Sequence, residues 1–450
     1  MRKKICYLTT ALLTSTMLLS SCGASTKTKK ASSEPETKKP YKTIDISKNT
    51  TELTANVPGI KDLKDTSSDA IVMKKEHKDA LAKVYQNLFA NVLKDSEKDS
   101  NVLISPTSIT MDFGMLENGA DGNTLKELEQ VINGGITYEE FNQLMYEQYK
   151  RYTSSLDLEF NIANSVWINN SLHKNAKEDF LNKAKSYYNS EVFLTPFSDS
   201  TADDINAWCN NKTKGMIQNI KPNVGPESSM HLINAIAFES EWEDEFEDED
   251  IIEDEKFTNA DNTTSTVNYL TYKDNNYFEY NGGLGFVKDY KGGEYGFFAM
   301  LPPEDLNPVE YIEKMQQENL TFADILSDSQ EADVHVKMPE FETSCDYKLN
   351  DTLINMGIKD SFSSANANFS KLYDDNTENN YLGSFDHFTY IKVDRTGTRA
   401  AAVSDANMAL GAIEPDKKQI AISLDRPFVY GIVDLATNLP IFIGCQNSME

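Results

Sequence analysis

Apolar residues recur along this chain at helical spacing in some stretches and at strand spacing in others. Two stretches have apolar residues three or four positions apart, which predicts amphipathic helices: Leu81, Val84, Leu88 and Val92, and then Leu125, Leu128 and Ile132. The second helix is expected to begin at Asn123 or Thr124. Short apolar runs rich in β-branched and aromatic residues predict strands, at 162–168, 232–238, 297–301, 334–338, 420–424 and 428–433. Because helices and strands do not alternate regularly, the pattern favours an α+β fold with large antiparallel or mixed sheets.

The composition indicates a folded protein that does not bind nucleic acid. Of the 450 residues, 39% are hydrophobic and 10% are aromatic, which is enough to bury a large core. The formal net charge of -28 argues against nucleic-acid binding, because phosphates are bound by clustered Lys and Arg. Much of the acidity lies in residues 239–255, ESEWEDEFEDEDIIEDE. This run could steer a cationic partner, but a solvated loop is the simpler interpretation.

The N-terminus has the pattern of an export signal. Residues 2–4, Arg-Lys-Lys, precede an apolar stretch at 8–19 that is too short to span a bilayer. Leu-Ser-Ser-Cys follows at 19–22, and the whole segment resembles the signal peptide and lipobox of bacterial lipoproteins. The resemblance implies that residues 1–21 are removed, that Cys22 is lipidated, and that the protein is anchored at the cell surface to the outer face of a bacterial membrane. An ordinary secretory signal is the alternative.

Residues 22–69 are predicted to be a flexible tether. The segment is dominated by Ser, Thr, Lys and Asp, and it has few apolar side chains. Such a composition cannot bury enough apolar surface to offset the entropy of ordering the chain. The folded domain is therefore expected to span residues 70–450.

The sequence lacks the signatures of common enzyme classes. It contains no GxSxG, no HExxH and no phosphate loop ending in GK[ST]. The five histidines show no metal-ligand spacing: His77, His173, His231, His335 and His387. We therefore expect no enzyme activity, no metal and no cofactor. A hydrolase whose Ser, His and Asp are scattered along the chain is the weakest alternative.

Several short motifs occur in an order that resembles one family. They are NVLISPTSI at 101–109, GADGNT at 119–124, NAIAF at 234–238 with Trp242 and Phe246, MLP at 300–302, VKMPEF at 336–341, GIKDSF at 357–362, GTRAAA at 397–402, RPF at 426–428 and FIG at 442–444. Each is weak alone, but the order over roughly residues 70–447 resembles that of the serpins, a family of serine protease inhibitors. The resemblance implies an α+β fold with three β-sheets, about eight or nine helices and an exposed reactive-centre loop at about 397–419.

The resemblance also implies a set of site residues. Ser105, Ser108, Asn234 and His387 match a polar cluster beneath the central sheet of serpins, and Trp242 matches the buried tryptophan where loop insertion begins. Taken singly, each of these is also compatible with an ordinary buried residue. The hinge before the reactive-centre loop is matched by six residues: Gly397, Thr398, Arg399, Ala400, Ala401 and Ala402.

Alternation along the hinge indicates a loop that can become a strand. Every second residue from Thr398 to Met408 is small or apolar, whereas the charged residues Arg399 and Asp405 fall in the interleaved set. One face could therefore be buried while the other stays wet, and no proline interrupts the run. As a bare string, the alanine-rich segment would also suit a helix.

The function implied by the resemblance is inhibition of a serine protease as a suicide substrate. The protease would cleave the loop and become acylated by it. The loop would then insert into the central sheet and distort the protease before the acyl-enzyme is hydrolysed. The expected partner is a target serine protease in a covalent complex with a monomeric inhibitor.

Two features depart from the usual family pattern. Arg395 and Arg399 stand where inhibitory members usually carry glutamates. The loop is also about five residues longer than usual, so the reactive bond is expected at Gly411–Ala412 within a window of 409–416. The small and apolar residues of that window favour an elastase-like or subtilisin-like protease.

A serpin-fold surface binding protein without inhibitory activity is the main alternative, because a fold does not fix a function. A bulky or charged residue on the inward face of the hinge would favour that alternative. The inward set contains none.

Overall fold

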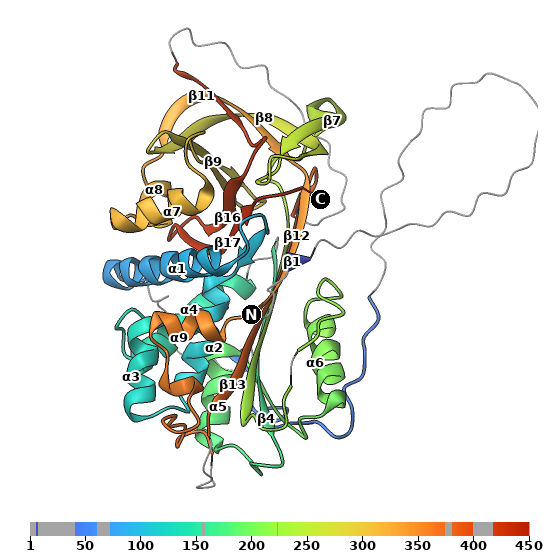
Figure 1. Ribbon diagram of the computed structural model, residues 1–450, viewed down its shortest axis with the longest axis vertical. Helices are drawn as coiled ribbons and strands as arrows, with labels where there is room; N and C mark the ends of the chain where they lie inside the picture. The colour runs from blue at the N-terminus through green and yellow to red at the C-terminus, as the bar shows by residue number, and fades with distance from the viewer. Residues whose placement is uncertain are drawn as a thin grey trace, which may run out of the picture.

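The computed structural model describes residues 6–7, 41–60, 73–154, 158–222, 224–373, 380–398 and 417–449. In this part of the chain there are nine α-helices: α1 (Lys75–Asp95), α2 (Pro106–Glu117), α3 (Gly122–Val131), α4 (Tyr138–Ser154), α5 (Glu178–Tyr188), α6 (Asp199–Lys212), α7 (Pro308–Gln317), α8 (Phe322–Leu326) and α9 (Asn350–Met356). Figure 1 shows α2 to α5 and α9 on one side of a long sheet and α6 on the other. The fold is α+β, as the pattern predicted.

The long sheet, which we call the central sheet, has eight strands in the described residues. Their order is β1 (Cys6–Tyr7), β12 (Phe341–Lys348), β13 (Leu382–Asp394), β14 (Gly397–Thr398), β6 (Met230–Glu241), β4 (Leu158–Asn169), β5 (Glu191–Thr195) and β2 (Thr51–Glu52). Strand β6 is buried along nearly its whole length because helices cover both faces of the sheet.

The remaining strands form a continuous path through a second layer. Its order is β15 (Gln419–Ser423), β11 (Gln330–Pro339), β8 (Thr264–Tyr280), β9 (Gly283–Asp289), β10 (Tyr295–Leu301), β16 (Phe428–Asp434), β17 (Leu439–Gln446) and β3 (Val102–Ile104), with β7 (Ile251–Thr258) paired to β8. The three expected sheets are present, and the second and the third are continuous with one another. The reason is that the long strand β8 pairs with β7 and β11 over most of its length and with β9 at its end.

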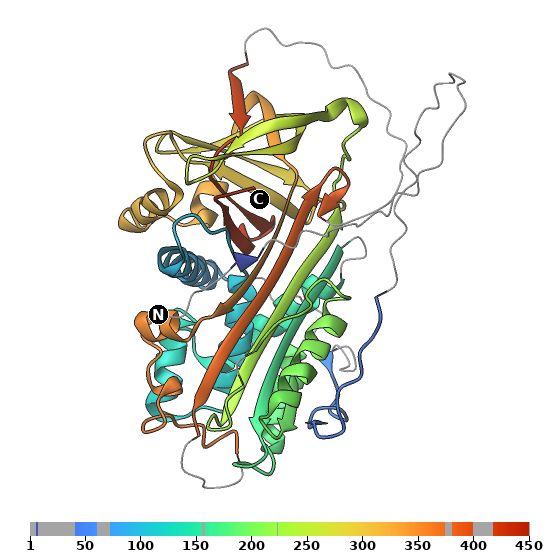
Figure 2. The same cartoon turned by 45° about the vertical axis from the view of Figure 1, so that its right-hand side comes forward.

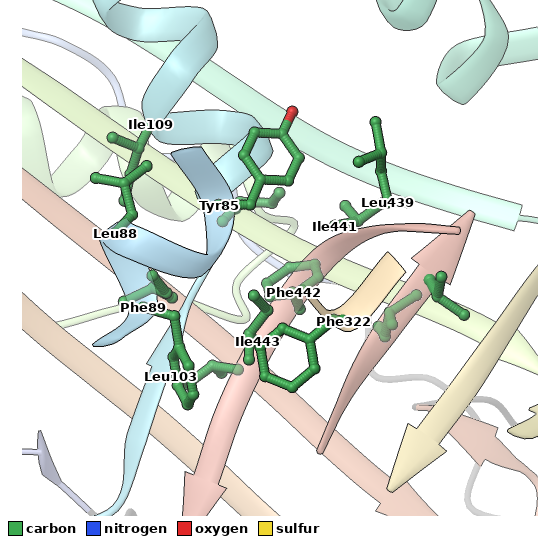
Figure 3. Close-up of a cluster of buried hydrophobic side chains, with 14 of the residues drawn as sticks. Tyr85, Leu88, Phe89, Leu103, Ile109, Phe322, Leu439, Ile441, Phe442 and Ile443 are labelled. Carbon is green, nitrogen blue, oxygen red and sulfur yellow. The ribbon is translucent and has the colours of Figure 1, made fainter. Parts of the chain in front are cut away.

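The main core lies where α1 packs on β17. Figure 3 shows side chains from α1, β3, α2, α8 and β17 gathered there, among them Tyr85, Leu88, Phe89, Leu103, Ile109, Phe322, Leu439, Ile441, Phe442 and Ile443. The predicted positions of α1 are buried in this core, which confirms the first helix. The second predicted helix, α3, begins at Gly122 rather than at Asn123 or Thr124 and ends before Ile132, which is its C-cap.

Each of the six predicted strands corresponds to a strand of the structure. Five of the predicted runs lie wholly within β4, β6, β10, β11 and β16. The sixth ends one residue beyond β15, at Leu424, whose backbone N–H still bonds to the carbonyl of Lys337 at 2.9 Å. Runs dense in β-branched and aromatic residues were therefore sufficient to locate these six strands, but not β8, β12, β13 and β17.

The structure corrects the predicted tether. Residues 41–60, which we call the strap, pack on the domain instead of leaving it, so the folded part begins well before residue 70. The Leu53 N–H donates to Val192 of β5 at 2.7 Å, and Ile60 is buried in the main core. Asp204 of α6 accepts hydrogen bonds from the Ser47 N–H at 2.7 Å, the Ser47 hydroxyl at 2.7 Å and the Thr50 hydroxyl at 2.5 Å. Ser47 and Thr50 are polar residues that composition alone would place in solvent, but in the structure they satisfy the buried carboxylate of Asp204.

Two further features concern the N-terminal region and membranes. Residues 6–7 form β1, which pairs antiparallel with β12 opposite Cys345 and Ser344. Within the described ranges, no helix combines the length and the apolar character needed to cross a bilayer.

Candidate functional site

The central sheet has a seam where two neighbouring strands run in the same direction. β13 and β6 pair directly and in parallel, from Leu382 opposite Met230 to Tyr390 opposite Ala237. Beyond Tyr390, the two-residue strand β14 lies between them and is antiparallel to both. Figure 2 shows β13, β6 and β4 side by side along the molecule. The seam is therefore closed over most of its length and filled by the first hinge residues at one end.

A buried hydrogen-bonded cluster crosses the seam where it is closed. His387 of β13 lies opposite Asn234 of β6, and their Nδ1 and Oδ1 atoms are 2.5 Å apart. The Asn234 amide donates to the Ser108 hydroxyl at 2.5 Å and to Asn164 Oδ1 of β4 at 2.7 Å. The Ser105 backbone N–H donates to His387 Nε2 at 3.0 Å. The structure thus brings together Ser105, Ser108, Asn234 and His387, the four residues that the resemblance grouped.

The hydrogen bonds of this cluster fix the state of its histidine. Because Nε2 of His387 accepts from the Ser105 N–H, the ring proton must be on Nδ1, which donates to Asn234. Burial lowers the pKa of His387 to about 3, so the ring is neutral at physiological pH. The two strands are therefore joined at this point by neutral hydrogen bonds, which can break without leaving a buried charge.

The hinge enters the seam through Gly397 and Thr398. Thr398 is fully buried, and its hydroxyl lies 2.5 Å from the Tyr290 hydroxyl. Gly397 has a φ of +153°, and a Cβ placed on it would lie 2.1 Å from the Ser240 carbonyl oxygen. A residue with a side chain would therefore collide with β6 here, so the close passage needs glycine.

Trp242 lies beside the hinge rather than in the polar cluster. Its indole N–H donates to the Asp394 carbonyl at 2.9 Å, its backbone N–H donates to Thr396 at 3.1 Å, and its ring stacks on Tyr290 at 4.7 Å. The backbone N–H of Phe246 similarly bonds to the Arg395 carbonyl at 3.1 Å. Residues 394–396 are thus held by main-chain contacts immediately before the hinge turns into the seam.

An aromatic box around Lys288 supports the residues that hold 394–396 in place. The Lys288 ammonium lies 5.5 Å from the ring centre of Trp242, 4.6 Å from that of Phe246 and 4.5 Å from that of Tyr272. It donates to the Asp244 carbonyl at 3.0 Å, and burial lowers its pKa to about 8. The cation therefore packs together the two aromatic residues whose backbones hold the hinge.

The sequence pattern missed two buried polar residues at the seam. Asn164 is the polar member of an otherwise apolar face of β4, shared with Ile162, Val166 and Ile168, and that exception was the available signal. Asp112 follows Ser108 by four residues on the same side of α2 and is fully buried. Of the remaining candidates, residues 399–402, Gly411, Ala412 and Cys22 lie outside the described residues. Where the chain is described, no three His, Cys, Asp or Glu side chains are arranged to hold a metal.

Comparison with known proteins identifies the family. The model of the family described as "Serpin (serine protease inhibitor)" matches residues 79–448. The chain belongs to the serpin family. It is 28% identical to serpin B10 of Plecturocebus moloch over 78% of this chain and 94% of that protein. It is also 28% identical to an uncharacterized serpin-like protein of Methanosarcina mazei, over 80% of this chain and 84% of the relative.

Solved serpin structures resemble the chain over most of its length. Tengpin, a thermophilic serpin, is 32% identical, and its native state superposes with a TM-score of 0.79 over 89% of this chain and all of that chain. The latent state of tengpin gives a TM-score of 0.72 over 85% of this chain and all of that chain. Thyroxine-binding globulin in complex with thyroxine is 25% identical, with a TM-score of 0.69 over 83% of this chain and 99% of that chain.

Proposed function

We propose that this serpin inhibits serine-type endopeptidases as a suicide substrate. The target cleaves the reactive-centre loop, its serine is acylated, and the released loop enters the seam between β13 and β6. Insertion carries the protease along and distorts its active site before water can hydrolyse the ester. The protein is consumed in the reaction and acts as an inhibitor, not as an enzyme.

The arrangement of β14 carries this proposal. β13 and β6 are parallel, and β14 is antiparallel to both. A strand that continued from β14 would replace one parallel pairing by two antiparallel pairings, which are slightly more stable per residue. Its backbone groups would be paired on both sides. The first two residues of the hinge already have the direction and register that an inserted loop requires.

The same register relates the loop to the polar cluster. Thr398 lies opposite Ser240 of β6 and Val393 of β13. Six residues further along an antiparallel strand, Ser404 would lie opposite Asn234 and His387, which stand six residues earlier on their strands. Ser404 belongs to the small, inward-facing set, and its hydroxyl could bond to both groups that insertion separates. The loop and the cluster are therefore matched in position as well as in chemistry.

The reactive bond is proposed at Gly411–Ala412, within the window 409–416. The window begins with Ala409 and Leu410, so the residues around the bond are small or apolar. They suit a protease with a small apolar primary pocket, of the elastase or subtilisin type. A protease that requires a basic residue at this position is not an expected target.

The proposed inhibition is tested by incubating the purified protein with an elastase and a subtilisin. A denaturing gel should show a covalent complex with the mass of the protease plus the cleaved inhibitor. The same protease with its catalytic serine blocked is the control and should give none. Cleavage in the window 409–416 without any complex would favour the alternative, a serpin-fold binding protein.

We further propose that the protein is a surface lipoprotein. Removal of residues 1–21 would leave Cys22 as the lipidated first residue and would also remove β1 from the edge of the central sheet. The strap begins at residue 41, so the linker to the membrane would be residues 22–40. Cys22→Ser should move the protein from the membrane fraction to the medium, whereas membrane retention of this variant would contradict the anchor. Sedimentation of the lipid-free protein should give a monomer.

A further inference from the structure

Asp112 is a buried acid at the seam, and within the described part of the chain its carboxyl has no hydrogen-bond partner. The residue is fully buried in α2, and among the described residues neither of its carboxyl oxygens makes a hydrogen bond. The Asn234 amide is close enough to favour the ionised carboxyl, but it donates to Ser108 and Asn164 instead. Burial is the stronger influence and raises the pKa of Asp112 well above its ordinary value. An unpartnered buried carboxyl destabilises the closed structure, so its presence needs an explanation.

Opening of the seam would change the surroundings of this carboxyl. A new strand between β13 and β6 requires them to separate by one further strand spacing, about 4.8 Å. The 2.5 Å contact between His387 and Asn234 cannot survive that movement. α2 packs against β4 and β6, and Ser108 accepts a hydrogen bond from Asn234, so Asp112 stays with Asn234 while β13 leaves. The Asn234 carbonyl oxygen then loses the N–H donor that held it.

A protonated carboxyl close to the Asn234 side chain can replace the lost donor. We infer that Asp112 is a positioning residue that donates its O–H to Asn234 Oδ1 when His387 withdraws, and so lowers the barrier to opening the seam. The inference rests on the proposed function, because it concerns the step in which the sheet accepts a strand. In the closed state the unpartnered acid destabilises the sheet, and in the opening state it satisfies Asn234. Both effects favour opening.

Other titratable groups surround α2, and their contributions to any pH dependence must be distinguished from that of Asp112. They are Tyr85 on α1, Glu117 on α2, Glu129 on α3, Tyr152 on α4, Tyr188 on α5, His387 on β13 and Cys445 on β17. Burial favours the neutral forms of the three tyrosines, of Glu117, of His387 and of Cys445. On the opposite face of the sheet, burial raises the pKa of Asp386 to about 7 and that of Asp346 to about 6. The titration of Asp112 is therefore isolated only by comparing variants at the same pH.

The test measures how fast the intact protein takes up a synthetic peptide with the sequence of residues 398–411, by the gain in heat stability. Asp112→Leu removes the donor and should slow uptake about tenfold, the effect of one hydrogen bond. It should also raise the melting temperature of the intact protein. Asp112→Asn keeps an N–H donor and should stay close to the parent rate. Thr110→Val, which removes a hydroxyl bonded to Thr107 on the same helix, is the matched control and should leave the rate unchanged.

The pH dependence of the uptake rate gives a second readout, which would not change if the role of Asp112 were merely structural. The parent should take up peptide more slowly as the pH rises and Asp112 loses its proton, whereas Asp112→Asn should lack that component. If Asp112→Leu takes up peptide at the parent rate, or if Asp112→Asn keeps the parent pH profile, the inference is wrong while the proposed function stands. The second criterion applies even if Asp112→Leu does not fold. If the parent itself takes up no peptide, the proposed function fails and the inference fails with it.

Discussion

Thr398 is the residue at which the insertion mechanism can be tested most directly. It is fully buried between β13 and β6, opposite Val393 and Ser240, and its hydroxyl bonds to Tyr290. Thr398→Arg would put a guanidinium in that position. The change lies far from the proposed reactive bond, so it should alter insertion without altering the bait that the protease recognises.

Two contributions set the size of the effect. The hydrogen bond to Tyr290 is worth about 1 kcal/mol, and its loss leaves the Tyr290 hydroxyl buried without a partner. Burying an unpaired guanidinium costs at least several kcal/mol, and this second contribution is the larger. The variant should therefore expel β14 from the seam, and further insertion should stall. Each 1.4 kcal/mol added to the barrier slows insertion about tenfold, so hydrolysis of the acyl-enzyme would win.

The assay counts the inhibitor molecules cleaved for each covalent complex formed with the target protease. Thr398→Arg should be cleaved at the parent rate and should form almost no complex. Thr398→Val keeps the shape and loses only the hydroxyl, so it should retain most of the complex. Arg399→Glu changes a position that the alternation predicts to face outward in the inserted strand, so it should also retain the complex. The comparison distinguishes the effect of side-chain direction from that of charge. If Thr398→Arg forms complex as efficiently as the parent, insertion through this seam is refuted.

The strap, the hinge glycine and a buried acid of the sheet give further predictions. Asp204→Ala removes three hydrogen bonds from the strap and should lower the unfolding free energy by about 1–3 kcal/mol, whereas the exposed control Asp203→Ala should change it little; equal melting temperatures would contradict a docked strap. Gly397→Ala should push β14 out of the seam and speed limited proteolysis of residues 397–419, and an unchanged cleavage rate would contradict the close passage. Burial raises the pKa of Asp386 to about 7 from an unfolded value of about 3.9, so its proton stabilises the native state at low pH. That stability, up to about 4 kcal/mol, should be lost as the pH rises from about 4 to about 7, and Asp386→Asn should remove this component from the melting profile.

The elements that sequence predicted well are those whose pattern is set by burial. Strand β16, for example, is buried on both faces, so its sequence is a nearly continuous apolar run that few other structures explain. Motif order then supplied what periodicity could not, namely that Ser105, Asn234 and His387 meet although they are far apart in the chain. Neither signal required knowledge of individual contacts.

The features that sequence missed depend on single polar contacts. The strap has the composition of a tether, but it is held by hydrogen bonds to α6, above all to Asp204, by pairing with β5 and by burial of Ile60, which composition does not register. Asp112 was missed because a helix as buried as α2 tolerates an acid only in its neutral form, and the letter Asp does not reveal its protonation state. The start of α3 at Gly122 was missed for a smaller reason, since capping preferences locate helix ends only to within a few residues.

The reversed charge at residue 395 has a structural explanation. The Arg395 guanidinium pairs with Asp248, in the acidic run 239–255, at 3.0 Å, but both side chains are exposed and such a pair contributes at most about 1 kcal/mol. The hinge is held here by backbone bonds to Trp242 and Phe246, which do not depend on the side chain at 395. Charge can therefore reverse at this outward position without disturbing the entry of the hinge into the seam. At Thr398 the side chain itself occupies the seam. An arginine there, whose side chain has four more heavy atoms than threonine, would meet β6 and β13 instead of water.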